Sequence, residues 1–323
     1  MNVSTSLENL YNQHTGLVSD KWELYLAEYE RLFSVLRDKP IGLVEIGVQN
    51  GGSLEIWSQY FSAAEAIVGC DINPLCSQLV YADERVRLVV GDVTEPETLE
   101  SILNGRNNFH IVIDDGSHTS SDIIKTFCNL FPRLDIDGIY IVEDLHCSYW
   151  EQFQGGLGHP QSSMSFFKTL TDILNFEHWG IDSNRLEVLK PFGITSQLSE
   201  SLLAELHSIE FVNSMCILRK RGKEFNILGR RRVVGTHESV APVKQVADTF
   251  NNVPKQKQNG AAVSHEPFDQ SNLDSALALV GNQKERIHKL EERLAELEVE
   301  LSSAKGECRN KPTIQQADLD KPK

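Results

Sequence analysis

The sequence predicts an α/β fold in which helices cover both faces of a doubly wound, Rossmann-like and mostly parallel sheet. Three observations indicate this fold. From residue 41 to residue 144, short apolar runs of strand length alternate with amphipathic segments of helix length. The first run ends in a glycine-rich turn, and acidic residues follow several of the others. Two later apolar runs are separated by only two residues, as in an antiparallel hairpin at the end of a sheet.

The expected elements follow in order along the chain. Residues 1–40 mix charged and apolar side chains at helical spacing, so we expect an N-terminal helical segment that ends at Pro40. Strands are expected at residues 42–47, 66–72, 86–90, 110–114 and 138–143, with helices at 53–61, 96–103 and 120–131 between them. The hairpin is expected at residues 209–212 and 215–219.

The composition changes after about residue 235, so the α/β domain is expected to span residues 41–235. Residues 236–271 contain few large apolar side chains, which predicts a flexible linker. Apolar residues then recur at seven-residue steps, at Leu273, Val280, Ile287, Leu294 and Leu301. This pattern predicts a coiled coil over residues 272–305, parallel and homotypic or with a partner helix, although a single solvated helix is an alternative. Residues 306–323 are expected to be a disordered tail.

The charge and composition exclude several classes of protein. The 323 residues include 31 Lys and Arg and 46 Asp and Glu, a formal net charge of −15 at pH 7. Such a chain repels phosphate backbones and anionic lipids. No run reaches the ~18 to 20 apolar residues of a membrane span, the first ten residues contain no leader, and the six cysteines form no Cys-x-x-Cys pair. We therefore expect a soluble cytoplasmic protein without a nucleic-acid partner, a membrane span, a disulfide framework or a zinc site.

A glycine-rich turn follows the first expected strand. Gly47, Gly51 and Gly52 let the backbone approach a ligand closely and leave free N–H groups at the start of the next helix. The dinucleotide motif Gly-x-Gly-x-x-Gly is broken, because Gln49 stands at its second glycine. The turn therefore favours a nucleotide-like cofactor that is not held by a pyrophosphate.

Acidic residues lie at the ends of successive expected strands. Glu45 is inside the first strand, Asp71 ends the second and Asp92 follows the third. In a doubly wound sheet these positions converge on the ligand crevice at the carboxyl edge. Carboxylates there accept hydrogen bonds from ribose hydroxyls or an adenine amine but repel a pyrophosphate, which favours S-adenosylmethionine as the cofactor. Alternatively, the three acids only cap helices or lie in solvated loops.

Two acidic pairs follow the fourth and fifth expected strands. Asp114 and Asp115 end one strand, and Glu143 and Asp144 end the next. Asp115, Glu143 and Asp144 emerge at the same edge, so we expect them to hold Mg²⁺ through carboxylate oxygens, with Asp114 on the cofactor side. His118 starts the next helix and is the expected general base. Alternatively, Asp114 or Asp115 caps that helix and Glu143 pairs with an arginine.

Three further residues are candidates for binding the acceptor. His146 follows the second acidic pair, and Tyr149 and Trp150 come shortly after it. Aromatic faces stack well on sugar rings, so this group is expected to shape an acceptor pocket. Tyr149 and Trp150 are equally compatible with a place in the core.

These motifs together resemble the class I S-adenosylmethionine-dependent methyltransferases, and more narrowly the bacterial metal-dependent sugar O-methyltransferases that act on macrolides, other glycosides and surface glycans. The resemblance covers roughly residues 15–235. It is carried by Ser19-Asp20-Lys21, Glu45-Ile46-Gly47-Val48, Gly51-Gly52-Ser53-Leu54, Gly69-Cys70-Asp71-Ile72, Gly91-Asp92, Asp114-Asp115-Gly116-Ser117-His118, Val142-Glu143-Asp144 and Ser148-Tyr149-Trp150.

The resemblance implies methyl transfer to a carbohydrate hydroxyl of a glycoside or surface glycan. It implies that Asp71 and Asp92 hold the ribose and adenine of the methyl donor and that His118 is the base beside the Mg²⁺ site. Through its predicted coiled coil, the protein is expected to form a homo-oligomer or to bind a glycan-synthesis partner. A catechol-like phenolic methyltransferase, a non-catalytic scaffold of such a complex and an NAD-dependent sugar dehydrogenase are the alternatives.

Overall fold

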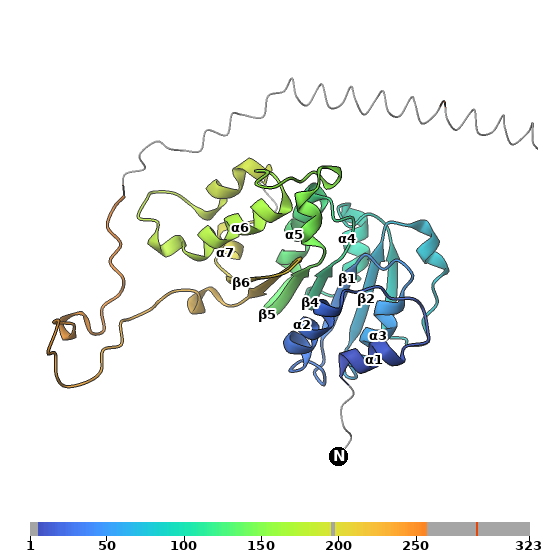
Figure 1. Ribbon diagram of the computed structural model, residues 1–323, viewed down its shortest axis with the longest axis horizontal. Coiled ribbons are helices and arrows are strands. Elements are labelled where there is room, and N and C mark those ends of the chain that lie inside the picture. Colours follow the sequence, from blue (N-terminus) through green and yellow to red (C-terminus); the bar gives the residue numbers. More distant parts are fainter. Residues whose placement is uncertain (1–5, 195–197, 257–288, 290–323) are drawn as a thin grey trace, which may run out of the picture. The chain divides into compact units, whose positions relative to one another are not determined.

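A seven-stranded sheet in the order β3-β2-β1-β4-β5-β7-β6 forms the centre of the fold (Figure 1). This computed structural model describes residues 6–194, 198–256 and Lys289. The strands are β1 (Gly42–Ile46), β2 (Ala66–Asp71), β3 (Val86–Val90), β4 (Phe109–Asp114), β5 (Leu134–Val142), β6 (Leu206–Val212) and β7 (Met215–Lys220). The first five pair in parallel, and β7 pairs antiparallel with both β5 and β6. The predicted mostly parallel sheet with a terminal hairpin is therefore confirmed.

Helices cover both faces of the sheet (Figure 1). They are α1 (Leu7–Gln13), α2 (Glu23–Phe33), α3 (Gly52–Tyr60), α4 (Pro96–Leu103), α5 (Ser120–Leu130), α6 (Ser163–Leu174) and α7 (Glu200–Leu203). Alternate strand residues enter two separate cores. Leu43 of β1 packs with α1, α2 and α3, whereas Val44 and Ile46 pack with α4, α5 and α6. A sheet buried on both faces explains why its strands are nearly continuous apolar runs.

The structure differs from the sequence prediction in two elements near the site. The expected N-terminal helical segment is two helices, because residues 14–22 are not helical and connect α1 to α2. Strand β5 begins four residues earlier than expected, at Leu134. Its register against β4 shifts between Phe109 and Ile111, and Asp137 has a positive φ of 65°. A bulge therefore continues the strand through polar residues that are typical of a loop.

The C-terminal expectations lie mostly outside the described residues. The predicted coiled coil at 272–305 and the tail at 306–323 lie there, except for Lys289. In the first part of the predicted linker, residues 236–256 are largely exposed and contain one short 3-10 helix, Lys244–Val246. Within the described segments, no helix combines the length and the apolar character that a bilayer span needs.

The register of the sheet brings the ends of its central strands together. Ile46 is paired with Cys70 on one side and with Asp114 on the other, and Asp114 is paired with Val142. The residues that follow these positions therefore emerge side by side at the carboxyl edge. Strands β4 and β5 are paired, so the acids that follow them emerge at the same edge of the sheet, as expected.

Candidate active site

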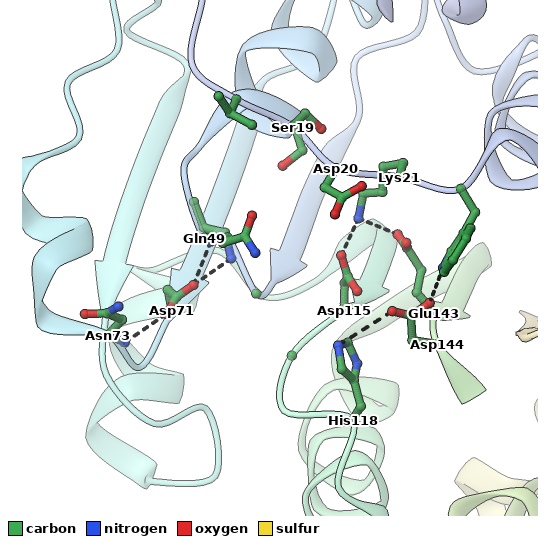
Figure 2. Close-up of a pocket in the computed structure, with 16 residues that line it drawn as sticks. Ser19, Asp20, Lys21, Gln49, Asp71, Asn73, Asp115, His118, Glu143 and Asp144 are labelled. Atoms are coloured by element: carbon green, nitrogen blue, oxygen red, sulfur yellow. Dashed lines mark hydrogen bonds and ion pairs between the residues drawn. The ribbon is translucent and has the colours of Figure 1, made fainter. Parts of the chain in front are cut away.

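A cavity of about 400 Å³ opens at the carboxyl edge of the parallel strands (Figure 2). Five segments line it: the connection between α1 and α2, the turn after β1, and the loops after β2, β4 and β5. The lining residues are Val18, Ser19, Asp20, Lys21, Trp22, Gly47, Val48, Gln49, Ser53, Asp71, Asn73, Asp115, Gly116, His118, Glu143 and Asp144. The cavity therefore lies where ligands bind in doubly wound folds.

The turn after β1 depends on Gly47 for both its conformation and its packing. Gly47 has a φ of +87°, and a Cβ atom there would lie 2.0 Å from the carbonyl oxygen of Asp115. The missing side chain therefore lets the loop after β4 approach the turn. Gly52 allows a second close approach, because its Cβ would lie 2.1 Å from the carbonyl oxygen of Leu17.

We expect Gly47→Ala to destabilise the fold more than Gly105→Ala. Both glycines have φ values near +80°, and an L-residue there costs roughly 1–2 kcal/mol. A Cβ at Gly105 meets nothing within 4 Å, so only this backbone cost applies to the control. At Gly47 the close contact of the new Cβ with the carbonyl oxygen of Asp115 adds to this backbone cost. Urea denaturation measures both changes, and equal losses would refute the close approach.

Asp71 holds the glycine turn through its carboxylate (Figure 2). Its Oδ2 accepts hydrogen bonds from the backbone N–H groups of Val48 and Gln49, each at 2.8 Å. Its Oδ1 accepts from the N–H of Asn73, also at 2.8 Å. The acid at the end of β2 therefore fixes the shape of the turn, and it also lines the cavity.

A buried lysine lies among three carboxylates, two of which, Asp115 and Glu143, are drawn in Figure 2. The Lys21 ammonium is 2.5 Å from Asp115 Oδ2, 2.7 Å from Glu143 Oε1 and 3.2 Å from Glu45 Oε1, and its side chain is 3% exposed. Burial opposes its charge, but the surrounding carboxylates hold the pKa of Lys21 well above its usual value. Burial also raises the pKa values of Glu45 and Glu143, and Lys21 opposes both shifts.

A second cluster joins Asp115 to the histidine. Asp115, His118 and Asp144 each place a possible ligand atom within 4.8 Å of the others, and His118 Nε2 lies 3.7 Å from Asp144 Oδ2 (Figure 2). His118 and Asp144 have positive φ values of 57° and 50°. Such backbone conformations cost about 1–3 kcal/mol and are concentrated at functional sites. Asp115 is shared by both clusters, because Glu45, Asp115 and Glu143 form the other.

The donor atoms and charge of this region fit a hard divalent cation. The two clusters contain four carboxylates and share Asp115, and Lys21 pairs with three of these carboxylates, those of Glu45, Asp115 and Glu143. When all four acids are ionised, three negative charges remain. Oxygen ligands of this kind suit Mg²⁺.

Six of the candidate residues from the sequence line the cavity: Gly47, Asp71, Asp115, His118, Glu143 and Asp144. The other candidates for cofactor binding do not. Glu45 is buried behind it and accepts hydrogen bonds from Ser53 and Trp57. Asp92 accepts from the N–H of Thr94 in the turn before α4.

The remaining candidates also lie outside the lining. Gly51 precedes α3 with a φ of 91°. Asp114 is buried, its Oδ2 has no hydrogen-bond partner among the described residues, and burial raises its pKa to about 8. His146, Tyr149 and Trp150 follow β5, and the His146 ring lies 5.0 Å from the Trp150 ring and 6.4 Å from that of Trp22.

The polar roles of α2 and of the residues before it were not predicted from the sequence. Lys21 belongs to a motif to which no function was assigned, and Trp22, Tyr25 and Tyr29 lie in the segment that was predicted only to be helical. Trp22 and Tyr25 donate hydrogen bonds to Asp144, and Tyr29 donates one to Glu143. Helical spacing predicts that these three residues share one face of the helix. It does not predict which carboxylates accept hydrogen bonds from their polar atoms.

The strand order and the cavity at the carboxyl edge define a doubly wound, Rossmann-like fold. Residues 44–145 match a family of methyltransferase domains, so the chain contains such a domain. The structure is similar to that of the MycE methyltransferase from the mycinamycin biosynthetic pathway in complex with Mg, SAH and mycinamycin VI. The TM-score is 0.54 at 23% identity, over 69% of this chain and 56% of that one. This likeness shows a shared fold.

Curated relatives match part of the chain. The enzyme of Streptomyces olivaceus named 8-demethyl-8-alpha-L-rhamnosyl tetracenomycin-C 2'-O-methyltransferase is 40% identical over 167 residues, covering 49% of this chain and 43% of the relative. Mycinamicin VI 2''-O-methyltransferase of Micromonospora griseorubida is 34% identical over 173 residues, covering 50% and 42%. The matched region thus spans less than half of the length of these relatives.

Proposed function

We propose that the protein is an S-adenosylmethionine-dependent O-methyltransferase that acts on a sugar hydroxyl of a glycoside, with Mg²⁺ as a second cofactor. One observation carries the proposal: Asp115, Glu143, Asp144 and His118 line the same cavity as the glycine turn and Asp71. A methyl donor, a metal-bound acceptor and a base can therefore meet in one place. The named activities of the relatives support a sugar acceptor.

The methyl donor is assigned to the side of the cavity formed by Gly47, Gln49 and Asp71. Gly47 lets the backbone approach a ligand closely on this side, and the carboxylate of Asp71 suits the ribose hydroxyls of the donor. Asp71 already uses both oxygens for backbone N–H groups, but a carboxylate has about four lone-pair sites. It can therefore hold the turn and accept from a ribose.

Asp115, Glu143 and Asp144 are the proposed ligands of Mg²⁺. When bound, the ion would act as a Lewis acid that lowers the pKa of the acceptor hydroxyl. His118 would accept the proton of that hydroxyl, and its Nε2 lies 3.7 Å from Asp144 Oδ2, beside the proposed metal ligands. The oxygen of the acceptor would then attack the methyl carbon, and the bond to sulfur would break as the neutral thioether leaves. Alignment of the reactants supplies part of the rate enhancement.

The acceptor is assigned to the aromatic surface beside Asp144. Trp22 is 61% exposed and Trp150 is 48% exposed, with the His146 ring between them. Exposed aromatic faces can stack on the apolar faces of a sugar ring. They would also accept a phenolic ring, so a catechol-like acceptor is the second candidate.

We expect Trp150→Ala to weaken binding of the acceptor without affecting the methyl donor. Loss of one stacking face is worth about 1 kcal/mol, which raises KM for the acceptor roughly fivefold. Steady-state kinetics with each substrate varied in turn measures the effect. Leu157→Ala is the control, because Leu157 is 92% exposed and is not part of the aromatic surface formed by Trp22, His146 and Trp150. An unchanged KM for the acceptor would exclude Trp150 from its binding surface.

The proposed function is tested by a methyl-transfer screen. The protein is incubated with labelled S-adenosylmethionine and panels of glycosides, sugars and catechols, with Mg²⁺ or with EDTA, and the mass of each product is measured. We expect a singly methylated glycoside that forms with Mg²⁺ and not with EDTA. Methylated catechols alone would support the second candidate. No transfer to any acceptor, together with no binding of the donor, would contradict the proposal.

A further inference from the structure

One short segment supplies hydrogen-bond donors to all three proposed metal ligands. It consists of Lys21 and the start of α2, and we call Lys21, Trp22, Tyr25 and Tyr29 the donor array. Trp22, Tyr25 and Tyr29 are spaced by three and four residues, so they share one face of the helix. Tyr25 and Tyr29 are at most 1% exposed, whereas Trp22 is at the surface.

The donor array contacts Asp115 and Glu143 through one oxygen each. Lys21 donates to Asp115 Oδ2 at 2.5 Å and to Glu143 Oε1 at 2.7 Å. The Tyr29 hydroxyl donates to the same oxygen, Glu143 Oε1. Two donors from different turns of the chain therefore hold one atom of Glu143 in place.

Asp144 is held in the same way. Its Oδ1 accepts from Trp22 Nε1 at 3.1 Å and from the Tyr25 hydroxyl at 2.9 Å. The Tyr25 oxygen also lies 3.1 Å from the backbone nitrogen of Asp144 and 2.8 Å from Ser214 Oγ. The connection between β6 and β7 thus fixes Tyr25, which in turn fixes Asp144.

The second oxygen of each carboxylate has no hydrogen-bond donor among the described residues. Within the described residues, Asp115 Oδ1, Glu143 Oε2 and Asp144 Oδ2 accept no hydrogen bond. The nearest charged neighbour of Asp144 Oδ2 is His118 Nε2, at 3.7 Å. Buried polar groups normally have a hydrogen-bond partner from the protein or from water, and all three of these carboxylates line the cavity. In each of these three neighbouring acids, the donor array bonds one oxygen and the other accepts no hydrogen bond from the described residues. This arrangement indicates that the three free oxygens share a ligand from outside the chain.

We propose that the donor array consists of positioning residues for the metal ligands, each fixing one oxygen so that the other is available to one divalent ion. This inference rests on the proposed function, because it assumes that these acids bind Mg²⁺. Partners of metal ligands set the orientation of those ligands, and their loss commonly reduces metal affinity 10- to 100-fold. Lys21 also neutralises part of the negative charge of the acidic cluster.

The test is Mn²⁺ binding to the full-length protein, measured by titration calorimetry without donor or acceptor. Tyr25→Phe and Tyr29→Phe remove one hydroxyl each and keep the ring. We expect each to weaken Mn²⁺ binding by roughly tenfold. Tyr140→Phe is the matched control, because the buried Tyr140 hydroxyl has no hydrogen-bond partner among the described residues and Tyr140 does not line the cavity. It should bind Mn²⁺ like the wild type.

Trp22→Phe separates positioning from folding. Trp22 is largely exposed, so losing its Nε1 donor should leave the melting temperature unchanged while Mn²⁺ binding weakens. Wild-type affinity in all three array variants, with or without a lower melting temperature, would show that the array is only structural. If the wild type transfers methyl groups but the variants bind Mn²⁺ normally, only this inference fails. If the wild type binds no Mn²⁺, the metal in the proposed function fails with it.

Discussion

Replacing His118 with Ala is expected to reduce kcat by a factor on the order of 10² to 10⁴, the usual contribution of a general base. His118 lines the cavity, and its Nε2 is 3.7 Å from Asp144 Oδ2. An alcohol is a weak nucleophile at neutral pH, so removal of the base should affect the chemical step. Affinity for S-adenosylmethionine, measured by calorimetry, should stay close to that of the wild type.

Two further variants control for indirect effects of this change. His118 has a φ of 57°, a conformation that Asn tolerates better than Ala. His118→Asn should therefore lose activity to a similar extent without the added backbone strain. His110→Ala should keep its activity, because His110 lies near the start of β4 and bonds the N–H of Gly42. Wild-type turnover in both His118 variants would refute its assignment as the base.

The second large effect concerns the proposed metal ligands. We expect Asp144→Asn to weaken Mg²⁺ binding by on the order of 100-fold or more, since loss of a ligand should cost at least as much as loss of an outer partner. Asn keeps an oxygen for the donors Trp22 and Tyr25 but removes the negative charge. Turnover should fall at low Mg²⁺ and recover partly at high Mg²⁺.

A surface acid provides the comparison for Asp144→Asn. Asp137→Asn also removes one negative charge, but Asp137 is 76% exposed and lies in the bulge of β5. It should leave the Mg²⁺ dependence of turnover unchanged. EDTA should abolish turnover of the wild type and of this control alike. Activity of Asp144→Asn that shows wild-type Mg²⁺ dependence would remove Asp144 from the ligand set.

The sheet could be predicted from the sequence because both of its faces are buried. Continuous apolar runs such as those of β1 and β4 identify parallel strands, and the expected bounds agree with the structure within about a residue. The early start of β5 could not be predicted, because its bulge places Asp135 and Asp137 inside a strand. No element was assigned where α6 lies, although Ser162 caps it and Phe166, Leu170 and Ile173 are buried at helical spacing.

Site residues could be predicted from the sequence where the end of a strand determines their position. The order of the strands brings Asp115 and Glu143 together, because each follows a paired residue at the carboxyl edge. The donor array could not be found in this way, since its contacts join residues more than 90 positions apart. Asp92 shows the opposite case: it follows a strand as expected, but β3 is the edge strand and the cavity lining does not include it.

The binding of one divalent ion by Asp115, Glu143 and Asp144 beside His118 can be observed by anomalous diffraction from crystals grown with Mn²⁺. We expect a single strong peak within coordination distance of the second oxygens of all three carboxylates, in the cavity that His118 lines. A peak elsewhere, or none at saturating Mn²⁺ with the three carboxylates turned away from one another, would contradict it.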